Sequence, residues 1–165
     1  MSAATADTGA CPYVVGEDLA RFSDEQARAW LGLLHAHRAL TRELDAALDA
    51  RYGLSLSGLE VLGRLAEQPD RQQRLTQLAT ASGLTLSRVS RLIGDLERRG
   101  LVERRPCPED ARAINAWLTD AGRALAREAQ ASHAADVQRR VFDRLDDEHL
   151  RALGEAFELL VPFTA

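Results

Sequence analysis

The side chains of this sequence best suited to bind another molecule are hydroxyl and guanidinium groups on one face of a predicted helix. Within the stretch GLTLSRVSRLIGDLERRGLVERR of residues 83–105, they are Thr85, Ser87, Arg88, Ser90 (near the edge of the face) and Arg91. Guanidinium groups pair bidentately with guanine or phosphate, and hydroxyl groups bond phosphate oxygens. On the first two turns of a helix, these groups predict contacts in the major groove of DNA. The alternative for such a helix alone is a solvated amphipathic face.

The apolar residues of this segment predict how the helix is held. They recur at spacings of three, four and three and are Leu86, Val89, Ile93 and Leu96. Such spacing gives one buried stripe opposite the arginines. Thr85 is a suitable N-cap and Gly100 a suitable end. A shorter helix at about 76–82, capped by Thr76, precedes the tight turn ASGLT, so the pair predicts a helix-turn-helix.

A basic β-hairpin is predicted directly after this helix. Residues 101–105 (LVERR) and 113–118 (AINAWL) alternate apolar and polar side chains, and PCPEDAR between them has turn chemistry. The candidate DNA-binding residues are Arg104 and Arg105 at the base, and Asp110 and Arg112 near the tip. An arginine at a hairpin tip can enter the minor groove, with the Asp110 carboxylate holding the guanidinium of Arg112. The alternative is a surface ion pair that contributes little.

Helical patterns precede the helix-turn-helix. SDEQ at residues 23–26 is a capping box that opens a long helix to about Tyr52, and Gly53 suits its left-handed C-cap. A second capping box at Ser57–Glu60 opens a short helix that ends near QPD.

Two more helices are predicted after the hairpin. Thr119 caps a long helix that runs to about Leu145, and Asp146 caps a last one that runs to about Leu160. The order is therefore four helices, a hairpin and two helices.

Charge along the chain is distributed in three blocks. The formal net charge is −4, but residues 71–112 hold nine arginines against five acidic residues, a net charge of +4. Residues 1–70 and 113–165 have net charges of −5 and −3. The positive block coincides with the helix-turn-helix and the hairpin, which favours an anionic partner there.

Several functional classes are excluded by missing patterns. The sequence has no glycine-rich phosphate loop, no HExxH and no nucleophile elbow, so we expect no enzyme. The four histidines and two cysteines lack metal-ligand spacing, so we expect neither a metal nor a cofactor. No apolar run approaches the roughly 20 residues that span a bilayer, and no signal peptide is evident. A cytoplasmic protein without a membrane partner is therefore expected.

Motifs along residues 56–122 carry a resemblance to a known family. They are Leu78-Ala79, Ser87 to Arg91, Leu96-Glu97, Gly100-Leu101-Val102 followed by Arg104, Asp110-Ala111-Arg112, and Leu118-Thr119-Asp120-Ala121-Gly122. In this order they resemble MarR-type winged-helix transcriptional regulators. Two positions depart from the family pattern. Asp-Ala-Arg stands where many members have Asp-Arg-Arg, and Trp117 stands where a smaller aliphatic residue is usual.

The resemblance implies a mainly α fold with a small β-hairpin wing, a winged helix-turn-helix, and a homodimer formed by the long N- and C-terminal helices. It also implies a repressor with two recognition helices in successive major grooves of a pseudo-palindromic operator. The predicted parts are a flexible N-terminal segment (1–22), a helical dimerisation region (23–54 and 119–165) and a winged helix-turn-helix (55–118). Apolar residues of the terminal helices independently favour a helical interface: Val137, Val141, Leu150, Leu153, Phe157 and Leu160.

The family resemblance further implies release from DNA by a small, often aromatic, ligand. The usual pocket lies between the dimer helices and the winged domain, and its candidates here are Trp30, His37, Arg38 and Leu62. Trp30 and His37 are equally explained as core or interface residues.

Two other interpretations remain open from the sequence. One is a helical protein-interaction module that uses a winged-helix core without binding DNA. The other is a redox-responsive regulator, because Cys107 lies between two prolines and near several arginines, which favour the thiolate, whereas Glu109 and Asp110 oppose it.

Overall fold

A computed structural model describes residues 21–107 and 110–161, and of Ala111 and Arg112 only the backbone. The chain divides into two units, residues 1–43 and 44–165. Helix α2 (Asp24–Tyr52) crosses this boundary, and the other described elements lie in the second unit.

The ends of α2 form as the sequence predicts. The Ser23 N–H donates to Gln26 Oε1 at 2.9 Å, and the Gln26 N–H donates to Ser23 Oγ at 3.2 Å. This reciprocal pair confirms the capping box. Gly53 follows the helix with φ of +59°, a left-handed conformation that glycine adopts without strain.

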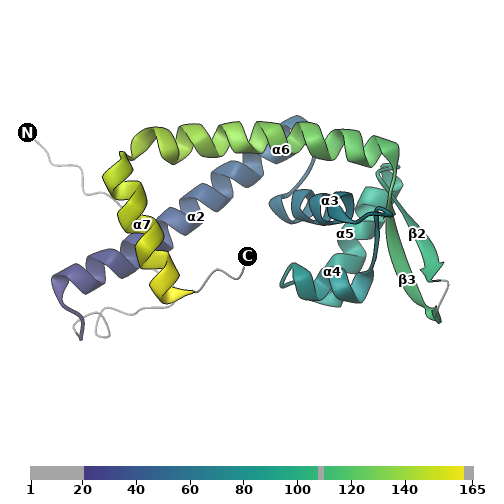
Figure 1. The fold of residues 1–165 in the computed structure, drawn as a ribbon, viewed down its shortest axis with the longest axis horizontal. Helices are drawn as coiled ribbons and strands as arrows, with labels where there is room; N and C mark the ends of the chain where they lie inside the picture. The colour runs from purple at the N-terminus through teal and green to yellow at the C-terminus, as the bar shows by residue number, and fades with distance from the viewer. Residues whose placement is uncertain (1–20, 108–109, 162–165) are drawn as a thin grey trace, which may run out of the picture. The chain divides into compact units, whose positions relative to one another are not determined.

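The winged part of the second unit consists of three helices and a small antiparallel sheet (Figure 1). The elements are α3 (Leu56–Glu67), β1 (Gln72–Arg74), α4 (Leu75–Ala81), α5 (Leu86–Arg98), β2 (Val102–Cys107) and β3 (Asp110–Leu118). The strand order is β1-β3-β2, so β3 is central. The expected helix-turn-helix and wing are confirmed, and the wing sheet has a third strand.

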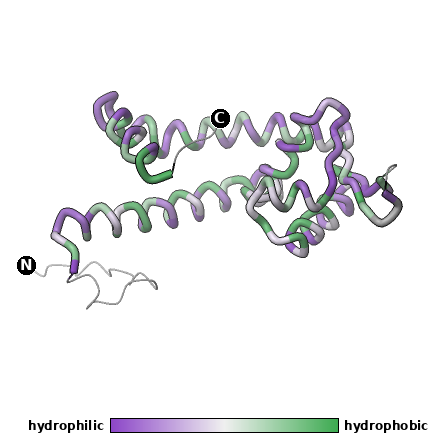
Figure 2. The backbone as a smooth tube through the Cα atoms, turned by 60° about the horizontal axis from the view of Figure 1, so that its bottom comes forward, coloured by the Kyte–Doolittle hydropathy of each residue, from purple (hydrophilic) through white to green (hydrophobic). Residues whose placement is uncertain are grey.

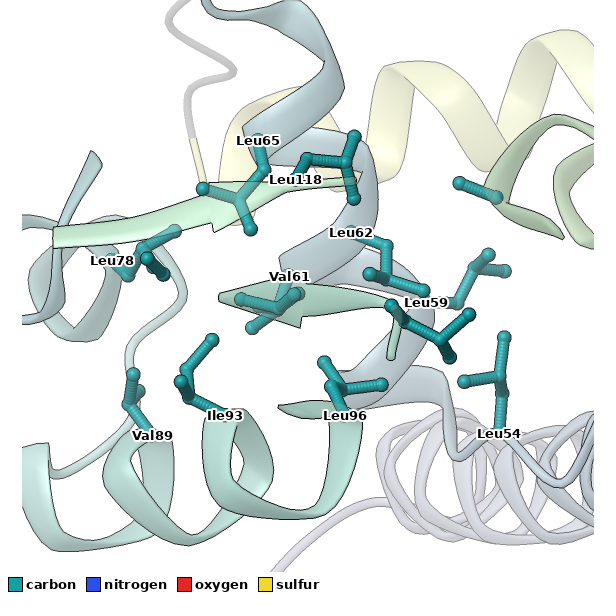
Figure 3. Packing of buried hydrophobic residues seen from close by; sticks show 14 of the residues in the cluster. Leu54, Leu59, Val61, Leu62, Leu65, Leu78, Val89, Ile93, Leu96 and Leu118 are labelled. Atoms are coloured by element: carbon teal, nitrogen blue, oxygen red, sulfur yellow. The ribbon is translucent and has the colours of Figure 1, made fainter. Parts of the chain in front are cut away.

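One apolar core holds these elements together. Its side chains point toward one another from α3, α4, α5 and β3, as Figure 3 shows. The labelled members are Leu54, Leu59, Val61, Leu62, Leu65, Leu78, Val89, Ile93, Leu96 and Leu118, all buried. Burying one such side chain stabilises the fold by about 1.5–3 kcal/mol, so this core fixes how α5 lies against the sheet.

The chain continues into α6 (Asp120–Arg140), a short 3₁₀ helix η1 (Phe142–Arg144) and α7 (Asp147–Leu160). Thr119 Oγ1 accepts from the Gly122 N–H at 3.0 Å, and Asp146 Oδ1 accepts from the His149 N–H at 2.9 Å. Both predicted N-caps are therefore confirmed. Hydrophilic and hydrophobic residues alternate along the helices (Figure 2). None of the helices in the described residues is long and apolar enough to span a bilayer.

Close packing explains the glycine in the Leu-Thr-x-x-Gly motif. A Cβ atom at Gly122 would lie 2.0 Å from the Leu101 carbonyl oxygen, a distance that no side chain tolerates. On the same helix, Ala126 and Ala129 are fully buried, and α6 packs against α3. Small residues thus let the start of α6 lie close to the winged core.

Several predicted boundaries are wrong by a few residues. The cap of α3 is Ser55, whose Oγ accepts from the Gly58 N–H at 3.0 Å, and Ser57 is within the helix. Helix α4 begins at Leu75 after Arg74, so Thr76 is inside it. Helix α6 ends at Arg140 because the backbone then tightens into η1.

The wing strands extend further than the alternation of apolar and polar residues predicts. β2 runs to Cys107, because Pro106 pairs with Ile114 although it has no N–H to donate. The pairing register shifts between Pro106 and Cys107, which marks a bulge or irregularity. Strand β1 was not predicted, because its three polar residues, QQR, carry no strand signal.

The predicted apolar stripe of α5 is wrong at one position. Val89, Ile93 and Leu96 are 3% exposed or less, whereas Leu86 is 48% exposed. Leu86 is the first residue of α5 and extends past the end of the core. It lines a cavity of about 240 Å³ that also involves Ser90 and Ile114.

A buried carboxylate joins the end of α2 to α6 within the second unit. Asp136 is 2% exposed, and Arg51 donates to its two oxygens at 2.8 and 3.3 Å. Arg51 also donates to Ser132 Oγ at 2.6 Å, and Arg139 donates to Asp136. The hydrogen bonds from Arg51 lower the pKa of Asp136, although burial raises it, and the charges of Arg51, Arg139 and Arg140 lower it further.

We expect Asp136→Asn to reduce the free energy of unfolding by about 1–3 kcal/mol at pH 7, because it weakens charge-assisted hydrogen bonds to a buried acceptor. Urea unfolding at one protein concentration measures the change. The matched control is Glu60→Gln, which breaks the exposed pair of Glu60 with Arg64. Its expected effect is below about 1 kcal/mol.

Wild type and Asp136→Asn also test how the free energy of unfolding depends on pH. The lowered pKa of Asp136 means that the stabilisation by its carboxylate is complete above about pH 4, near the unfolded pKa, and is lost as the pH falls through the folded pKa. The stability difference between wild type and Asp136→Asn should therefore shrink below about pH 4. A difference that stays constant between pH 7 and 3 contradicts this assignment.

Candidate nucleic-acid interface

The outer face of α5 is set by what its inner face buries. Val89 and Ile93 are fully buried in the core, so the opposite side of the helix faces away from it. Four of the five predicted residues are exposed, namely Thr85, Ser87, Arg88 and Arg91, and Ser90 is half-buried. The Thr85 Oγ1 accepts from the Arg88 N–H at 3.3 Å, which caps the first turn beside these side chains.

Arg88 and Arg91 differ from the other arginines of the basic block. Within the described residues, neither guanidinium has a hydrogen-bond or ion-pair partner. The acidic side chains nearby are paired with other arginines: Asp95 with Arg98, Glu97 with Arg104, and Glu103 with Arg105. The outer face of α5 therefore carries uncompensated positive charge, which can bind phosphates or base edges.

Arg104 lies against α5. Its Nη2 donates to the Ser90 carbonyl oxygen at 2.6 Å, and its Nη1 is 3.5 Å from Glu97 Oε2. Its backbone N–H donates to Glu97 Oε1 at 3.0 Å. Sequence reasoning predicts a DNA contact for Arg104, and that contact stays a prediction. The observed bonds tie β2 to α5 and fix the wing relative to the helix.

Arg105 lies across the outer surface of the wing sheet. Its Cζ is 3.8 Å from the centre of the Trp117 ring, and its Nη2 is 2.9 Å from Glu103 Oε2. Arg71 approaches the same ring at 5.3 Å and pairs with Asp120 at 2.5 Å. The unusual Trp117 is thus a stacking partner for two arginines.

The tip of the wing falls partly outside the described residues. Asp110 begins β3 and is exposed, and Arg112 belongs to the same strand. The side chain of Arg112 is outside the described part of the chain, so its pairing with Asp110 stays a prediction.

Arg99 connects α5 to the end of α2, a role that the sequence pattern does not predict. It follows α5, and its guanidinium donates to the carbonyl oxygens of Tyr52 and Gly53, each at 2.6 Å. These bonds satisfy free carbonyls at the end of α2. The end of α5 is therefore tied to the end of α2, through partners 46 and 47 residues away in the sequence.

The predicted ligand-pocket residues lie in both units. Trp30, His37 and Arg38 are at exposed positions of α2 in the first unit, with Trp30 42% exposed, whereas Leu62 is fully buried in the winged core. Their assembly into one pocket stays a prediction.

Sequence reasoning missed a cavity of about 560 Å³ between α3 and α6. Its lining includes Gly63, Glu60, Gln130 and His133. The Nδ1 atom of His133 is buried and has no hydrogen-bond partner among the described residues. No group of histidine, cysteine and acidic side chains in the described residues could hold a metal ion.

Comparisons with known proteins agree with this geometry. Residues 52–113 match the MarR family pattern. The HTH-type transcriptional repressor YetL of Bacillus subtilis (strain 168) is 31% identical over 114 residues, which cover 67% of this chain and 68% of YetL.

Solved structures agree as well. Sco3205, a MarR family transcriptional regulator from Streptomyces coelicolor whose crystal structure is in complex with DNA, is 34% identical with a TM-score of 0.77, and the match covers 84% of this chain and 87% of Sco3205. AbsC, a MarR family transcriptional regulator from the same organism, is 32% identical with a TM-score of 0.75, covering 84% and 93% of the two chains. On these relationships and the winged helix-turn-helix, the chain belongs to the MarR family of transcriptional regulators, which are not enzymes.

Proposed function

We propose that this protein is a repressor that binds a pseudo-palindromic DNA operator as a homodimer and is released by a small ligand. The observation that carries the proposal is the pair Arg88 and Arg91, exposed on α5 without partners in the described residues. An α-helix fits the major groove, and the arginine forks match guanine O6 and N7. Support also comes from Sco3205, which was solved in complex with DNA, and from YetL, which is a repressor.

The wing supplies the second contact in this proposal. Arg104 and Glu97 hold β2 against α5, so the hairpin keeps a fixed position when the helix enters the groove. Arg112 near the tip then enters the adjacent minor groove, where negative potential is enhanced. Arg105 contributes a phosphate contact from the sheet surface beside Trp117.

A second copy of the chain is the expected partner of the terminal helices. None of the residues of α7 is buried, and Leu153 is 40% and Leu160 66% exposed. A soluble helix rarely leaves such an apolar face in water. Two-fold pairing covers it and places two α5 helices on half-sites about one helical turn apart.

The ligand proposal rests on the cavity between α3 and α6. Its volume of about 560 Å³ suits a small organic molecule. His133 and Gln130 line it and offer ring and amide donors, whereas Arg64 in the same lining is already paired with Glu60. Trp30, His37 and Arg38 on α2 remain sequence-based candidates for ligand contacts.

Selection of bound fragments from a random duplex library tests the operator proposal. We expect a palindromic winner with half-sites about one helical turn apart and an affinity that falls steeply with salt. A scrambled duplex of equal length is the control. Equal, weak binding to both duplexes contradicts sequence-specific recognition and supports the protein-interaction module.

Substitutions on α5 test the major-groove assignment. We expect Arg91→Ala and Arg88→Ala each to weaken binding to the selected duplex by about 1–3 kcal/mol, because each removes a guanidinium contact. If base preference is lost at one position of the duplex, the arginine contacts a base. If affinity falls equally for all sequences and depends less steeply on salt concentration, the arginine contacts a phosphate. Fluorescence anisotropy at several salt concentrations measures both.

The matched control is Arg98→Ala on the same helix, because Arg98 pairs with Asp95 and lies in the last turn. It should change affinity little. If Arg88→Ala and Arg91→Ala bind the duplex as wild type does, the assignment of α5 to the major groove is wrong.

Arg112→Ala tests the wing. We expect a loss of about 1–3 kcal/mol in DNA affinity with an unchanged unfolding midpoint, because the guanidinium is assigned to DNA. Arg123→Ala, on α6, changes the same charge outside the wing and should leave affinity nearly unchanged. Equal affinities of wild type and Arg112→Ala would remove the wing from the interface.

A further inference from the structure

A small polar cavity lies on the wing sheet next to the start of α4. Its volume is about 300 Å³, and its lining includes Asp70, Gln72, Arg74, Cys107 and Asn115. It shares no lining residue with the larger cavity between α3 and α6, to which the proposed function assigns a ligand. A molecule bound in the small cavity therefore occupies a second, separate site.

Three of the polar side chains lie on one face of the wing sheet. Gln72 and Arg74 are two residues apart in β1, and residues two apart in a strand point to the same face. Arg74 pairs directly with Asn115 of β3, so these two side chains share that face as well. The register of the sheet thus places a guanidinium group beside a carboxamide in the cavity.

A chain of hydrogen bonds fixes the orientation of the Asn115 carboxamide. Gln72 Nε2 donates to Asp70 Oδ2 at 2.6 Å, and this bond lowers the pKa of Asp70, so at neutral pH the carboxylate only accepts. With its nitrogen turned to Asp70, the Gln72 amide presents its oxygen to Asn115, and Asn115 Nδ2 donates to that oxygen at 3.5 Å. The carbonyl oxygen of Asn115 is left as the remaining acceptor.

This carbonyl oxygen is buried and unpaired. Asn115 is 7% exposed, and its Oδ1 atom has no hydrogen-bond partner among the described residues. A buried acceptor without a donor destabilises a fold. A ligand that brings an N–H group to Asn115 Oδ1 therefore gains a hydrogen bond that the described residues do not supply.

The guanidinium group of Arg74 gives the cavity a positive charge. Its Nη2 donates to Cys107 Sγ at 3.3 Å, but a thiol sulfur is only a weak acceptor. A carboxylate is a much stronger acceptor for a guanidinium, because the bond is assisted by charge and can be bidentate. Asp70 and Arg74 together give the lining one negative and one positive group, which suits a ligand that carries both charges.

We propose that this cavity binds a small α-amino acid in its zwitterionic form. The ammonium group of the ligand donates to Asn115 Oδ1, and the nearby negative charge of Asp70 favours it there. The carboxylate of the ligand accepts from Arg74. Both charged groups of an amino acid are attached to one carbon atom, so they can reach side chains at directly paired strand positions. The volume is small for a ligand cavity, which favours amino acids with small side chains.

Isothermal titration calorimetry of the full chain with glycine, L-alanine and L-serine tests the ligand class. Each amino acid is compared with two analogues, one that lacks the ammonium group and one that lacks the carboxylate; for L-alanine these are propionate and ethylamine. We expect at least one amino acid to bind, at least about tenfold more tightly than either analogue, because each analogue loses one charge-assisted hydrogen bond. If no amino acid binds, or if one analogue binds equally well, the proposal is wrong.

Two variants test whether binding occurs in this cavity. Asn115→Leu nearly keeps the side-chain size and removes the unpaired acceptor, so it should weaken binding at least about tenfold without lowering the thermal unfolding midpoint of the free protein. Arg74→Gln should weaken binding to a similar extent, because the ligand carboxylate loses its charged donor. Arg74 precedes α4, so this variant is compared only where its circular dichroism matches wild type.

The matched control for these variants is Gln138→Leu. It removes an exposed carboxamide on α6 that bonds to Asp143, and it should leave the affinity for the amino acid unchanged. Wild-type affinity in both Asn115→Leu and Arg74→Gln overturns the assignment of the site. None of these measurements uses DNA, so failure of the operator experiments leaves their result intact.

Discussion

The burial of Val89, Ile93 and Leu96 on one side of α5 is the constraint on which the rest of the interface depends. These side chains fix the orientation of the helix about its axis. Rotating the helix would expose two or three of them to water, at a cost of several kcal/mol. Arg88 and Arg91 then face outward, and no other described residue pairs with them. A rigid scaffold of this kind presents charged groups in register before DNA arrives, which lowers the ordering cost of binding.

Ion pairs and hydrogen bonds extend this rigidity from the helix to its neighbours. Arg104 ties α5 to β2 through Ser90 and Glu97, and Arg99 ties the end of α5 to the end of α2. Most arginines of the basic block are therefore structural, although the block has a net positive charge. Arg88 and Arg91, which have no partner in the described residues, are concentrated on one helix face, so positive charge is exposed there although the whole chain has a net charge of −4.

Local signals predict a large part of this fold. Ser23, Thr85, Thr119 and Asp146 each cap a helix as expected, because a cap depends on residues within one turn. The exposed face of α5 follows from helical spacing alone. Leu86 is the exception, because spacing cannot show where the core under a helix ends.

Interactions between distant segments are outside the reach of such patterns. Strand β1 exists because Gln72, Gln73 and Arg74 pair with β3, and three polar residues carry no strand signal of their own. The positions of Arg99 and Arg104 depend on partners in other elements. The cavity with Cys107 and Asn115 appears only when β1, β2 and β3 are assembled.

A hydroxyl-radical footprint of the protein on its selected duplex tests most directly that two α5 helices enter successive major grooves. Such docking predicts two protected windows on one face of the duplex, centred about 10 base pairs apart. A single window, or even protection along the duplex, would contradict the two-fold arrangement of the recognition helices.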